Sequence, residues 1–369
     1  MNFRQPILLS ADRFTNLQQT PWAGDQICRH LKDRIFPERI GNLVGESWEF
    51  SCDPNFPSLV PEFGIDLPTF INQNQALLLS TRLASAGKGC EVLLKTLNAA
   101  SPLSLQVHPP DDYSELADDE CGKPESWYVL AAKEGAGLYL GFKSAMKTEG
   151  LRALLQSGVD LEPYLQFVPV KAGDYFDLGP GVVHAVGAGV LLLEPQRQIS
   201  GKSGKTYRLW DWGRKYNSEG REDLEGQGRT LHIEKALSLF DPTKQTGAEF
   251  INNLRKLPRV EKINGFKSSR FPDNGHYQLI LVEQEQTETE EISNRPLSVI
   301  LQDGYAAALV LNGKCKITSE SRELEVTKGQ PLFIPGACHK FNISSLEAQT
   351  KLAFIVPSGT LFQLGEIQP

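Results

Sequence analysis

The 369-residue sequence has no Cys-x-x-Cys pair, and its six cysteines are scattered along the chain. Small secreted domains that depend on disulfides carry dense cysteines, and cysteine-based zinc clusters use closely spaced pairs. A disulfide framework and a zinc cluster are therefore minor alternatives here. The cysteine pattern predicts reduced thiols in a cytoplasmic protein.

Long apolar runs are also missing. No segment approaches the roughly 20 consecutive apolar residues that a membrane-spanning helix needs. The first apolar run, Ile7-Leu8-Leu9, is too short for the core of a secretory signal and is soon followed by Asp12 and Arg13. We therefore expect no membrane partner and no targeting segment.

The chain has no excess of basic residues. Its 38 lysines and arginines stand against 45 aspartates and glutamates, which gives a formal net charge of -7. Proteins bind the phosphate backbone of nucleic acids through basic surfaces. Nucleic acid is thus not the expected partner, and an anionic ligand would have to be bound by a local group of basic side chains.

Four side chains in the first half of the chain have the chemistry of a metal site. Gln106 and His108 are two residues apart, so on a β-strand both side chains leave the same face. Glu125 and His184 could complete a four-ligand site, because imidazole and carboxylate oxygen both suit zinc. A neutral glutamine leaves the metal more electrophilic than a second carboxylate would, which favours polarisation of a substrate carbonyl. We therefore predict a metal enzyme with one zinc ion per chain.

Most of the chain has the pattern of β-structure. Apolar runs predict strands within 91–108, at 167–170 and at 190–194. Residues 151–155 have helical spacing, so the segment from 111 to about 160 is expected to be a partly helical insertion. A second helix is expected at 231–237, ended by Asp241-Pro242-Thr243.

Two segments of the chain resemble each other. One runs from Val170-Lys171-Ala172-Gly173-Asp174 to His184, and the other from Val326-Thr327-Lys328-Gly329-Gln330 to His339. Each combines a glycine turn, an apolar strand, a Pro-Gly turn and a histidine, which resembles the second motif of cupin jelly rolls. The expected fold class is therefore mainly β, with tandem cupin-type jelly-roll barrels. Residues 1–250 would form the catalytic domain, and residues 251–369 a C-terminal cupin-like domain.

The second copy is chemically different from the first. No Gln-x-His or His-x-His pair precedes His339, and Lys314-Cys315-Lys316 stands roughly where the partner strand is expected. His339 is therefore expected to be a structural or surface residue. The C-terminal barrel should be degenerate and support the first one.

A basic segment with interleaved aromatic residues follows His184. Its basic residues are Arg197, Lys202, Lys205, Arg208, Arg214 and Lys215, and its aromatic residues are Tyr207, Trp210 and Trp212. A solvated loop is the alternative for any one of them. Ser203-Gly204-Lys205-Thr206 is not a nucleotide-binding P-loop, because that motif requires glycine where Ile199 stands. If Arg208 and Arg214 converge on the metal pocket, their guanidinium groups suit a phosphate or an oxyanion.

Together these motifs resemble the type I mannose-6-phosphate isomerase (phosphomannose isomerase) family of the cupin superfamily, in a compact form. The resemblance covers nearly all of the first 250 residues. Its segments are Pro21-Trp22-Ala23-Gly24, Gly45-Glu46-Ser47-Trp48-Glu49, Pro102-Leu103-Ser104-Leu105-Gln106-Val107-His108-Pro109, Gly122-Lys123-Pro124-Glu125, Val183-His184-Ala185, Thr206-Tyr207-Arg208-Leu209-Trp210-Asp211-Trp212 and Leu231-His232-Ile233-Glu234-Lys235-Ala236. The family pattern implies zinc on the four residues chosen above from spacing.

The resemblance also implies a substrate pocket. Lys95, Ser104, Lys123 and Arg208 are expected to lie in it, with Trp22 near its wall. Three positions depart from the family pattern. Many members have Trp-Gly-Gly at 22–24, and the longer members have a histidine at 122 and a lysine at 214. A ring-opening role for that histidine therefore cannot be transferred, and the arginine at 214 keeps the charge with a different geometry.

The expected reaction is the interconversion of mannose 6-phosphate and fructose 6-phosphate through an enediol. Zinc would hold O1 and O2 of the sugar while a side chain moves the proton between carbons. Arg208 and Lys123 are the expected catalytic residues, and Lys123 is the expected proton handler, with Lys95, an ionised carboxylate or bound water as alternatives. Lys95, Ser104, Trp22 and Arg214 are the expected substrate contacts.

Two other functions are compatible with a cupin frame. A non-catalytic cupin that binds a sugar and holds its metal as a structural group is the first, because one fold hosts many functions. A metal-dependent oxygenase is the second, and it is disfavoured because iron oxygenases usually show two histidines and one carboxylate with open positions.

Overall fold

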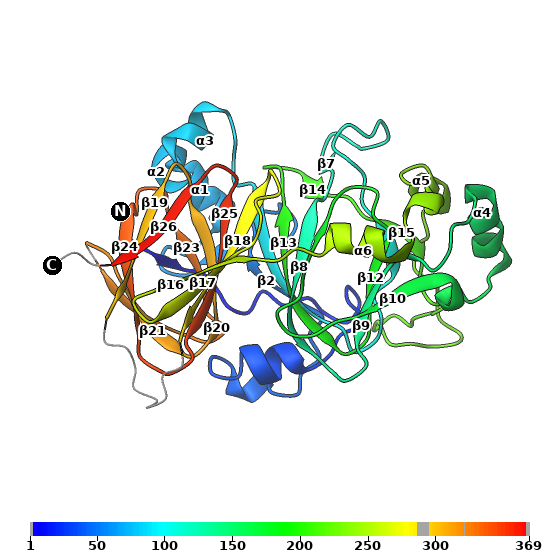
Figure 1. Ribbon diagram of the computed structural model, residues 1–369, viewed down its shortest axis with the longest axis horizontal. Coiled ribbons are helices and arrows are strands. Elements are labelled where there is room, and N and C mark those ends of the chain that lie inside the picture. The colour runs from blue at the N-terminus through cyan, green and yellow to red at the C-terminus, as the bar shows by residue number, and fades with distance from the viewer. Residues whose placement is uncertain (1–2, 286–294, 321, 367–369) are drawn as a thin grey trace.

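The first half of the chain forms a barrel of two antiparallel five-stranded sheets (Figure 1). One sheet has the order β11-β8-β13-β5-β2 and the other β10-β9-β12-β6-β15. These strands are β2 (Glu46–Phe50), β5 (Val92–Asn98), β6 (Leu105–Val107), β8 (Glu125–Ala132), β9 (Gly137–Phe142), β10 (Leu165–Pro169), β11 (Tyr175–Leu178), β12 (His184–Val186), β13 (Val190–Arg197) and β15 (Tyr207–Trp210). Apolar side chains from both sheets pack against each other between them, among them Leu97, Leu140 and Leu192.

The second half repeats this arrangement, with one extra strand at each edge of its larger sheet. Its sheets have the orders β1-β23-β20-β25-β18-β17-β16 and β22-β21-β24-β19-β26. The strands are β1 (Ile7–Leu8), β16 (Arg259–Ile263), β17 (Phe266–Arg270), β18 (Tyr277–Gln284), β19 (Leu297–Gln302), β20 (Ala306–Asn312), β21 (Lys314–Thr318), β22 (Glu323–Thr327), β23 (Pro331–Ile334), β24 (Lys340–Ser345), β25 (Lys351–Pro357) and β26 (Leu361–Glu366). The predicted mainly β fold with two jelly-roll barrels is confirmed.

The two barrels lie side by side in the computed structural model, which describes residues 3–285, 295–320 and 322–366 (Figure 1). They share a hydrophobic core, in which Phe50 and Leu94 of the first barrel pack with Tyr277 and Ile355 of the second. The N-terminal strand β1 also pairs with β23 of the second barrel. The N-terminal part of the chain thus contributes β1 to the second barrel and β2 to the first. The predicted domain boundary near residue 250 stays a prediction.

Helices are few and peripheral. They are α1 (Leu67–Asn72), α2 (Gln75–Leu78), α3 (Thr81–Ser85), α4 (Thr148–Ser157), α5 (Ile233–Leu237) and α6 (Gly247–Leu254), with helical turns at Ile27–Leu31, Pro37–Arg39, Glu162–Tyr164 and Pro242–Lys244. Four short strands complete the structure, β3 (Leu59–Val60), β4 (Ile65–Asp66), β7 (Glu120–Cys121) and β14 (Ser203–Gly204). Within the described residues, no helix has the length and hydrophobicity needed to cross a membrane.

Most predicted elements are present. The expected strands correspond to β5, β6, β10 and β13, and the expected helix at 231–237 corresponds to α5. The insertion at about 111–160 is partly helical as expected, through α4, but it also contains strands of the barrel. β8 and β9 of the same segment are inner strands of the two sheets, where Trp127, Val129 and Leu138 are fully buried. This segment is therefore part of the barrel.

The histidines of the internal repeat have different surroundings. His184 opens β12 and is fully buried, whereas His339 precedes β24 and is exposed. The sheet orders also correct the expected partner strand of His339. Lys314-Cys315-Lys316 lies in β21, which takes the place of β9, while β19 takes the place of β6. The contact of His339 with β19 is a backbone hydrogen bond, in which the Leu301 N–H donates to the His339 carbonyl at 2.9 Å.

Candidate metal centre and active-site cavity

Three buried side chains meet inside the first barrel. Glu125 opens β8, His184 opens β12, and His108 follows β6, so all three stand at strand ends. Glu125 lies 3.3 Å from Nε2 of His108 through Oε2 and 3.3 Å from Nε2 of His184 through Oε1. Two ligands held tetrahedrally at about 2.1 Å from a zinc ion are separated by about 3.4 Å. The spacing therefore fits a common metal ion.

Backbone contacts fix the orientation of both imidazoles. Nδ1 of His108 lies 3.1 Å from the Lys205 carbonyl, and Nδ1 of His184 lies 2.8 Å from the Val182 carbonyl. A carbonyl only accepts, so each Nδ1 carries a proton, and in the neutral imidazole Nε2 then presents a lone pair. Both lone pairs face the Glu125 carboxylate.

The ligand atoms of these three side chains form a site that suits a cation. Nε2 of His108, Nε2 of His184 and Oε1 of Glu125 are buried and have no hydrogen-bond partner within the part of the chain that the structure describes. Buried polar atoms are rarely left unpaired, since each costs roughly 1–3 kcal/mol. Among the described residues these three side chains form the only group of histidines, cysteines or carboxylates close enough to hold a metal ion. Their donor set fits zinc.

Gln106 lies beside this group. It pairs directly with His184 across β6 and β12, and with Arg208 across β6 and β15. Directly paired residues of antiparallel strands point to the same face. His184, Gln106 and Arg208 therefore form a row across three strands. With neighbouring strands about 4.8 Å apart, the row places Arg208 about 10 Å from His184.

Burial and charge keep the ligands in their metal-binding forms. Burial lowers the pKa of His108 to about 4, so its imidazole is neutral at pH 7. Burial alone would raise the pKa of Glu125, but the Lys123 ammonium at 3.0 Å from Oε2 helps to hold it well below its usual range. The pKa of Lys123 is raised in turn, because the Glu125 and Glu194 carboxylates outweigh its burial. Lys123 is therefore a cation.

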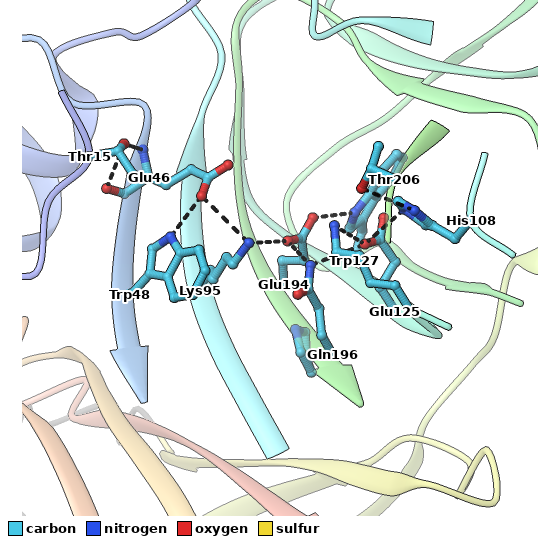
Figure 2. A network of polar contacts seen from close by, with 12 residues as sticks. Thr15, Glu46, Trp48, Lys95, His108, Glu125, Trp127, Glu194, Gln196 and Thr206 are labelled. Atoms are coloured by element: carbon cyan, nitrogen blue, oxygen red, sulfur yellow. Dashed lines mark hydrogen bonds and ion pairs between the residues drawn. The ribbon is translucent and has the colours of Figure 1, made fainter. Parts of the chain in front are cut away.

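A chain of polar contacts leads away from the metal centre (Figure 2). Gln196 donates from Nε2 to Glu125 at 3.1 Å and also to Glu194. The other oxygen of Glu194 accepts a 3.1 Å hydrogen bond from the Trp127 indole. Lys95 completes the chain, with its Nζ 3.8 Å from Glu194. Burial, together with the charge of Glu125, raises the pKa of Glu194 to about 7.

A cavity of about 380 Å³ opens beside these residues. Gln106 and Lys123, which flank the metal ligands, form part of its wall, as do Glu194 and Arg208. The cavity thus has a metal-binding side, a carboxyl group with a pKa near neutrality and several cationic side chains. This combination suits a small anionic substrate that needs both a Lewis acid and a proton acceptor.

The sequence is related to known isomerases, although no protein-family model matches it. It is 33% identical over 230 residues to "Mannose-6-phosphate isomerase" of Streptococcus mutans, a match that covers 62% of this chain and 66% of that protein. It is 30% identical over 261 residues to "Probable mannose-6-phosphate isomerase GmuF" of Bacillus subtilis, which covers 70% of this chain and 73% of that one. The chain belongs to the mannose-6-phosphate isomerase family.

The fold agrees with this relationship. The crystal structure of the mannose 6-phosphate isomerase from Bacillus subtilis superposes with a TM-score of 0.73 over 95% of this chain and 99% of that one, at 23% identity. At this level of identity the structural match shows the fold alone.

The cavity of this mannose-6-phosphate isomerase family member collects most of the predicted substrate contacts. Its wall includes Trp22, Lys95, Ser104, Lys123 and Arg208. Arg214 is the exception, because it is not part of the wall. Its guanidinium donates instead to the Asp211 carboxylate at 2.8 Å and to the Ser101 hydroxyl at 3.1 Å.

Glu194 and Arg229 are among the wall residues that sequence reasoning missed. A charged residue directly after Val190-Leu191-Leu192-Leu193 was a readable signal for Glu194, since a carboxyl group in a buried strand is unusual. Arg229 lies in a polar loop and has no local pattern that distinguishes it from its neighbours.

Proposed function

We propose that this protein is a zinc-dependent aldose–ketose isomerase that interconverts mannose 6-phosphate and fructose 6-phosphate. The observation that carries the proposal is the convergence of three buried, unpartnered ligand atoms beside a cationic cavity. Membership in the mannose-6-phosphate isomerase family supports the choice of reaction. The unpaired, buried cysteines support a reducing compartment, which we propose to be the cytoplasm.

The proposed metal ligands are His108, Glu125 and His184, with Gln106 as the fourth. The two imidazoles already present unprotonated Nε2 atoms, and Gln106 adjoins His184. When bound, zinc supplies the Lewis acidity that stabilises negative charge on the sugar's O1 and O2. One ion per chain follows from the single ligand group among the described residues.

Glu194 is the proposed base for the carbon-bound proton. An aldose and its ketose differ by one proton on carbon and one on oxygen. In the forward direction a base removes the proton from C2 while O1 gains a proton, which gives the enediol; O2 then loses its proton as the base returns one to C1. A base works best when its pKa is close to the operating pH, and the pKa of Glu194 is raised to about 7.

Lys123 is the proposed proton donor to oxygen, which refines the expectation that it handles the proton. Its ammonium group is paired with Glu125 and lines the cavity. A cation in this place stabilises developing negative charge on O1 or O2 and can give it a proton. The remaining residues of the wall, Lys95, Ser104, Trp22 and Arg208, are proposed to hold the sugar and its phosphate.

The row of His184, Gln106 and Arg208 orients the substrate. Its length of about 10 Å is comparable to the distance from the carbonyl end of an open-chain hexose to its 6-phosphate. We therefore place C1 and C2 beside His184 and Gln106, which would hold the metal, and the phosphate at Arg208. Arg214 acts only indirectly, through Asp211.

The repeated histidines provide a matched test. His184→Ala should lose tightly bound zinc and isomerase activity together, because it removes a ligand. His339→Ala should retain one equivalent of zinc and nearly full turnover, because His339 is exposed. Zinc is measured by elemental analysis after dialysis, and turnover with mannose 6-phosphate.

Two results would count against the proposal. A full equivalent of zinc in folded His184→Ala would show that the ligands are misassigned. A zinc-loaded parent protein that binds mannose 6-phosphate without converting it would instead support a sugar-binding cupin.

A further inference from the structure

Arg229 lies next to Arg208 at the wall of the cavity. It belongs to the loop between β15 and α5, and its side chain is 18% exposed. Arg208 donates from Nη1 to the carbonyl of Thr230, the residue that follows Arg229. Arg208 of β15 and Arg229 of the loop that follows this strand therefore both line the cavity.

Asp211 holds Arg229 in a fixed orientation. Nε of Arg229 donates to Oδ2 at 2.7 Å, and Nη2 donates to Oδ1 at 2.6 Å. This two-point contact fixes the plane of the guanidinium group as well as its position. Arg214 donates to Oδ1 of the same carboxylate at 2.8 Å, and Asp211 is only 5% exposed. The aspartate thus joins Arg214 behind the cavity to Arg229 at its wall.

This group has more positive than negative charge. The guanidinium groups of Arg214 and Arg229 contact the single buried carboxylate of Asp211, and the charges of Arg229 and Asp211 both act on nearby Arg208. Among the described residues, Glu222 is the only other carboxylate paired with these arginines, at 4.0 Å from Arg214, and it is 59% exposed. No carboxylate in the described part of the chain forms an ion pair with Arg208. Burial and the positive charge of Arg229 lower the pKa of Arg208.

An excess of cationic charge at a cavity wall is costly unless an anion binds there. A phosphate monoester carries close to two negative charges at neutral pH and has three acceptor oxygens. Guanidinium groups donate to such oxygens in pairs. Two adjacent guanidinium groups in place before the substrate arrives would therefore match a sugar phosphate in both charge and geometry.

We propose that Arg229 is a second phosphate-binding residue beside Arg208, and that Asp211 positions it. The inference rests on the proposed function and deepens it, since it assigns the preference for phosphorylated over free sugars to a pair of arginines. Arg229 thereby takes the role that the sequence pattern gave to Arg214.

Arg229→Ala and Arg221→Ala form a matched pair of variants. Both arginines lie in the same loop, but Arg221 is 70% exposed and pairs with exposed Glu219. In Arg229→Ala we expect the inhibition constant of inorganic phosphate and the KM for mannose 6-phosphate to rise about ten- to hundredfold. Zinc content should stay at one equivalent, and kcat should change less than KM. Arg221→Ala should match the parent protein.

Arg229→Lys and Asp211→Asn separate charge from orientation. The lysine keeps the charge but loses the two-point contact with Asp211, so its KM should fall between those of the parent and Arg229→Ala. Asp211→Asn should also raise KM more than it lowers kcat, because it disturbs the direction of Arg229 and leaves the metal side intact. If Arg229→Ala does not fold, Arg229→Gln provides the same comparison with a similar side-chain length.

The outcomes distinguish the two proposals. If the parent converts mannose 6-phosphate and Arg229→Ala stays within twofold of Arg221→Ala in both constants, the inference about Arg229 is wrong. If the zinc-loaded parent does not convert mannose 6-phosphate, the proposed function fails. In that case the phosphate site is still tested by calorimetric titration with inorganic phosphate, where Arg229→Ala should bind at least tenfold more weakly than Arg221→Ala.

Discussion

Glu194 shows how single residues obtain their chemistry from their surroundings. Every residue of β13 is buried, so the Glu194 carboxyl group is removed from water. Lys95, its direct partner on β5, favours the charged form, whereas burial and Glu125 favour the protonated form. Burial and the charge of Glu125 prevail, and the pKa of Glu194 rises to about 7. An ordinary surface glutamate would be fully ionised at this pH and a weaker base.

The pKa of Glu194 predicts the pH dependence of the isomerase. A base acts in its ionised form, so kcat/KM should rise with pH through about 7 and then level off. Glu194→Gln should lower kcat by about 10²- to 10⁴-fold while zinc is retained. Glu194→Asp should keep part of the activity and a sigmoidal pH profile. An acidic limb near pH 4 in the parent would mean that another group is the base.

The raised pKa of Glu194 can also be tested through protein stability, without an activity measurement. Because the pKa of Glu194 is higher in the folded than in the unfolded state, its contribution to stability is greatest below the unfolded pKa of about 4.3 and is lost as pH rises through about 7. Between pH 5 and pH 8, the free energy of unfolding of the parent should therefore fall relative to that of Glu194→Gln. Urea denaturation at the two pH values measures this difference.

At the scale of elements, a buried ion pair ties the first barrel to a turn of the second. Lys32 follows the helical turn at Ile27–Leu31 and is fully buried. Its Nζ lies 2.5 Å from Oε2 of Glu49 on β2 and 2.6 Å from the Gly329 carbonyl, between β22 and β23. Glu49 also accepts from the Thr96 hydroxyl on β5 at 3.0 Å. Burial lowers the pKa of Lys32, and Glu49 opposes this shift.

Removal of one partner should be strongly destabilising. Lys32→Met leaves the Glu49 carboxylate buried without a cation, which costs about 3–5 kcal/mol of unfolding free energy. Lys32→Met/Glu49→Gln should recover much of this loss, since no charge stays buried. Denaturant unfolding checks both variants.

Arg34 provides the matched control for this prediction. It forms an ion pair with Glu347 of the second barrel at 2.6 Å, but both side chains are 39% exposed. Arg34→Met should therefore cost less than about 1 kcal/mol. An equal loss of stability in Lys32→Met and Arg34→Met would contradict the importance of burial.

At the scale of the whole molecule, the second barrel contacts the strands that present the active site. Tyr277 of β18 is fully buried, and its hydroxyl donates to the Pro195 carbonyl at 2.8 Å and contacts the Ser126 hydroxyl at 2.9 Å. Ser126 follows Glu125 on β8, and Pro195 follows Glu194 on β13. One side chain of the second barrel thus connects the strand of a proposed ligand with the strand of the proposed base.

Loss of this hydroxyl should weaken the metal centre from a distance. In Tyr277→Phe we expect stability to fall by about 1–3 kcal/mol, and zinc to bind roughly three- to tenfold more weakly. Tyr305→Phe is the control, because Tyr305 is equally buried and its hydroxyl accepts the N–H groups of Glu91 and Val92. It should lose similar stability and keep its zinc affinity. Identical zinc affinities in the two variants would refute the link.

Local patterns in the sequence were sufficient for the fold class and for the cluster of His108, Glu125 and His184. The alternation that places Gln106 and His108 on one face is a property of any strand, and the glycine-turn repeat at 173 and 329 recurs because both barrels need the same turn. Helical spacing at 151–155 correctly indicated α4, whereas β8 and β9 of the same segment were not recognised because their buried runs lack alternation.

Only the tertiary structure decided which charged residues face the cavity. Arg214 and Arg229 are indistinguishable by local pattern, and the position of Asp211 between them places one behind the wall and the other in it. Contacts between residues far apart in the chain likewise determine the pKa of Glu194, the burial of Lys32 and the hydrogen bonds of the Tyr277 hydroxyl. Strand periodicity is set by neighbouring residues, whereas desolvation and ion pairing are set by what the fold brings together.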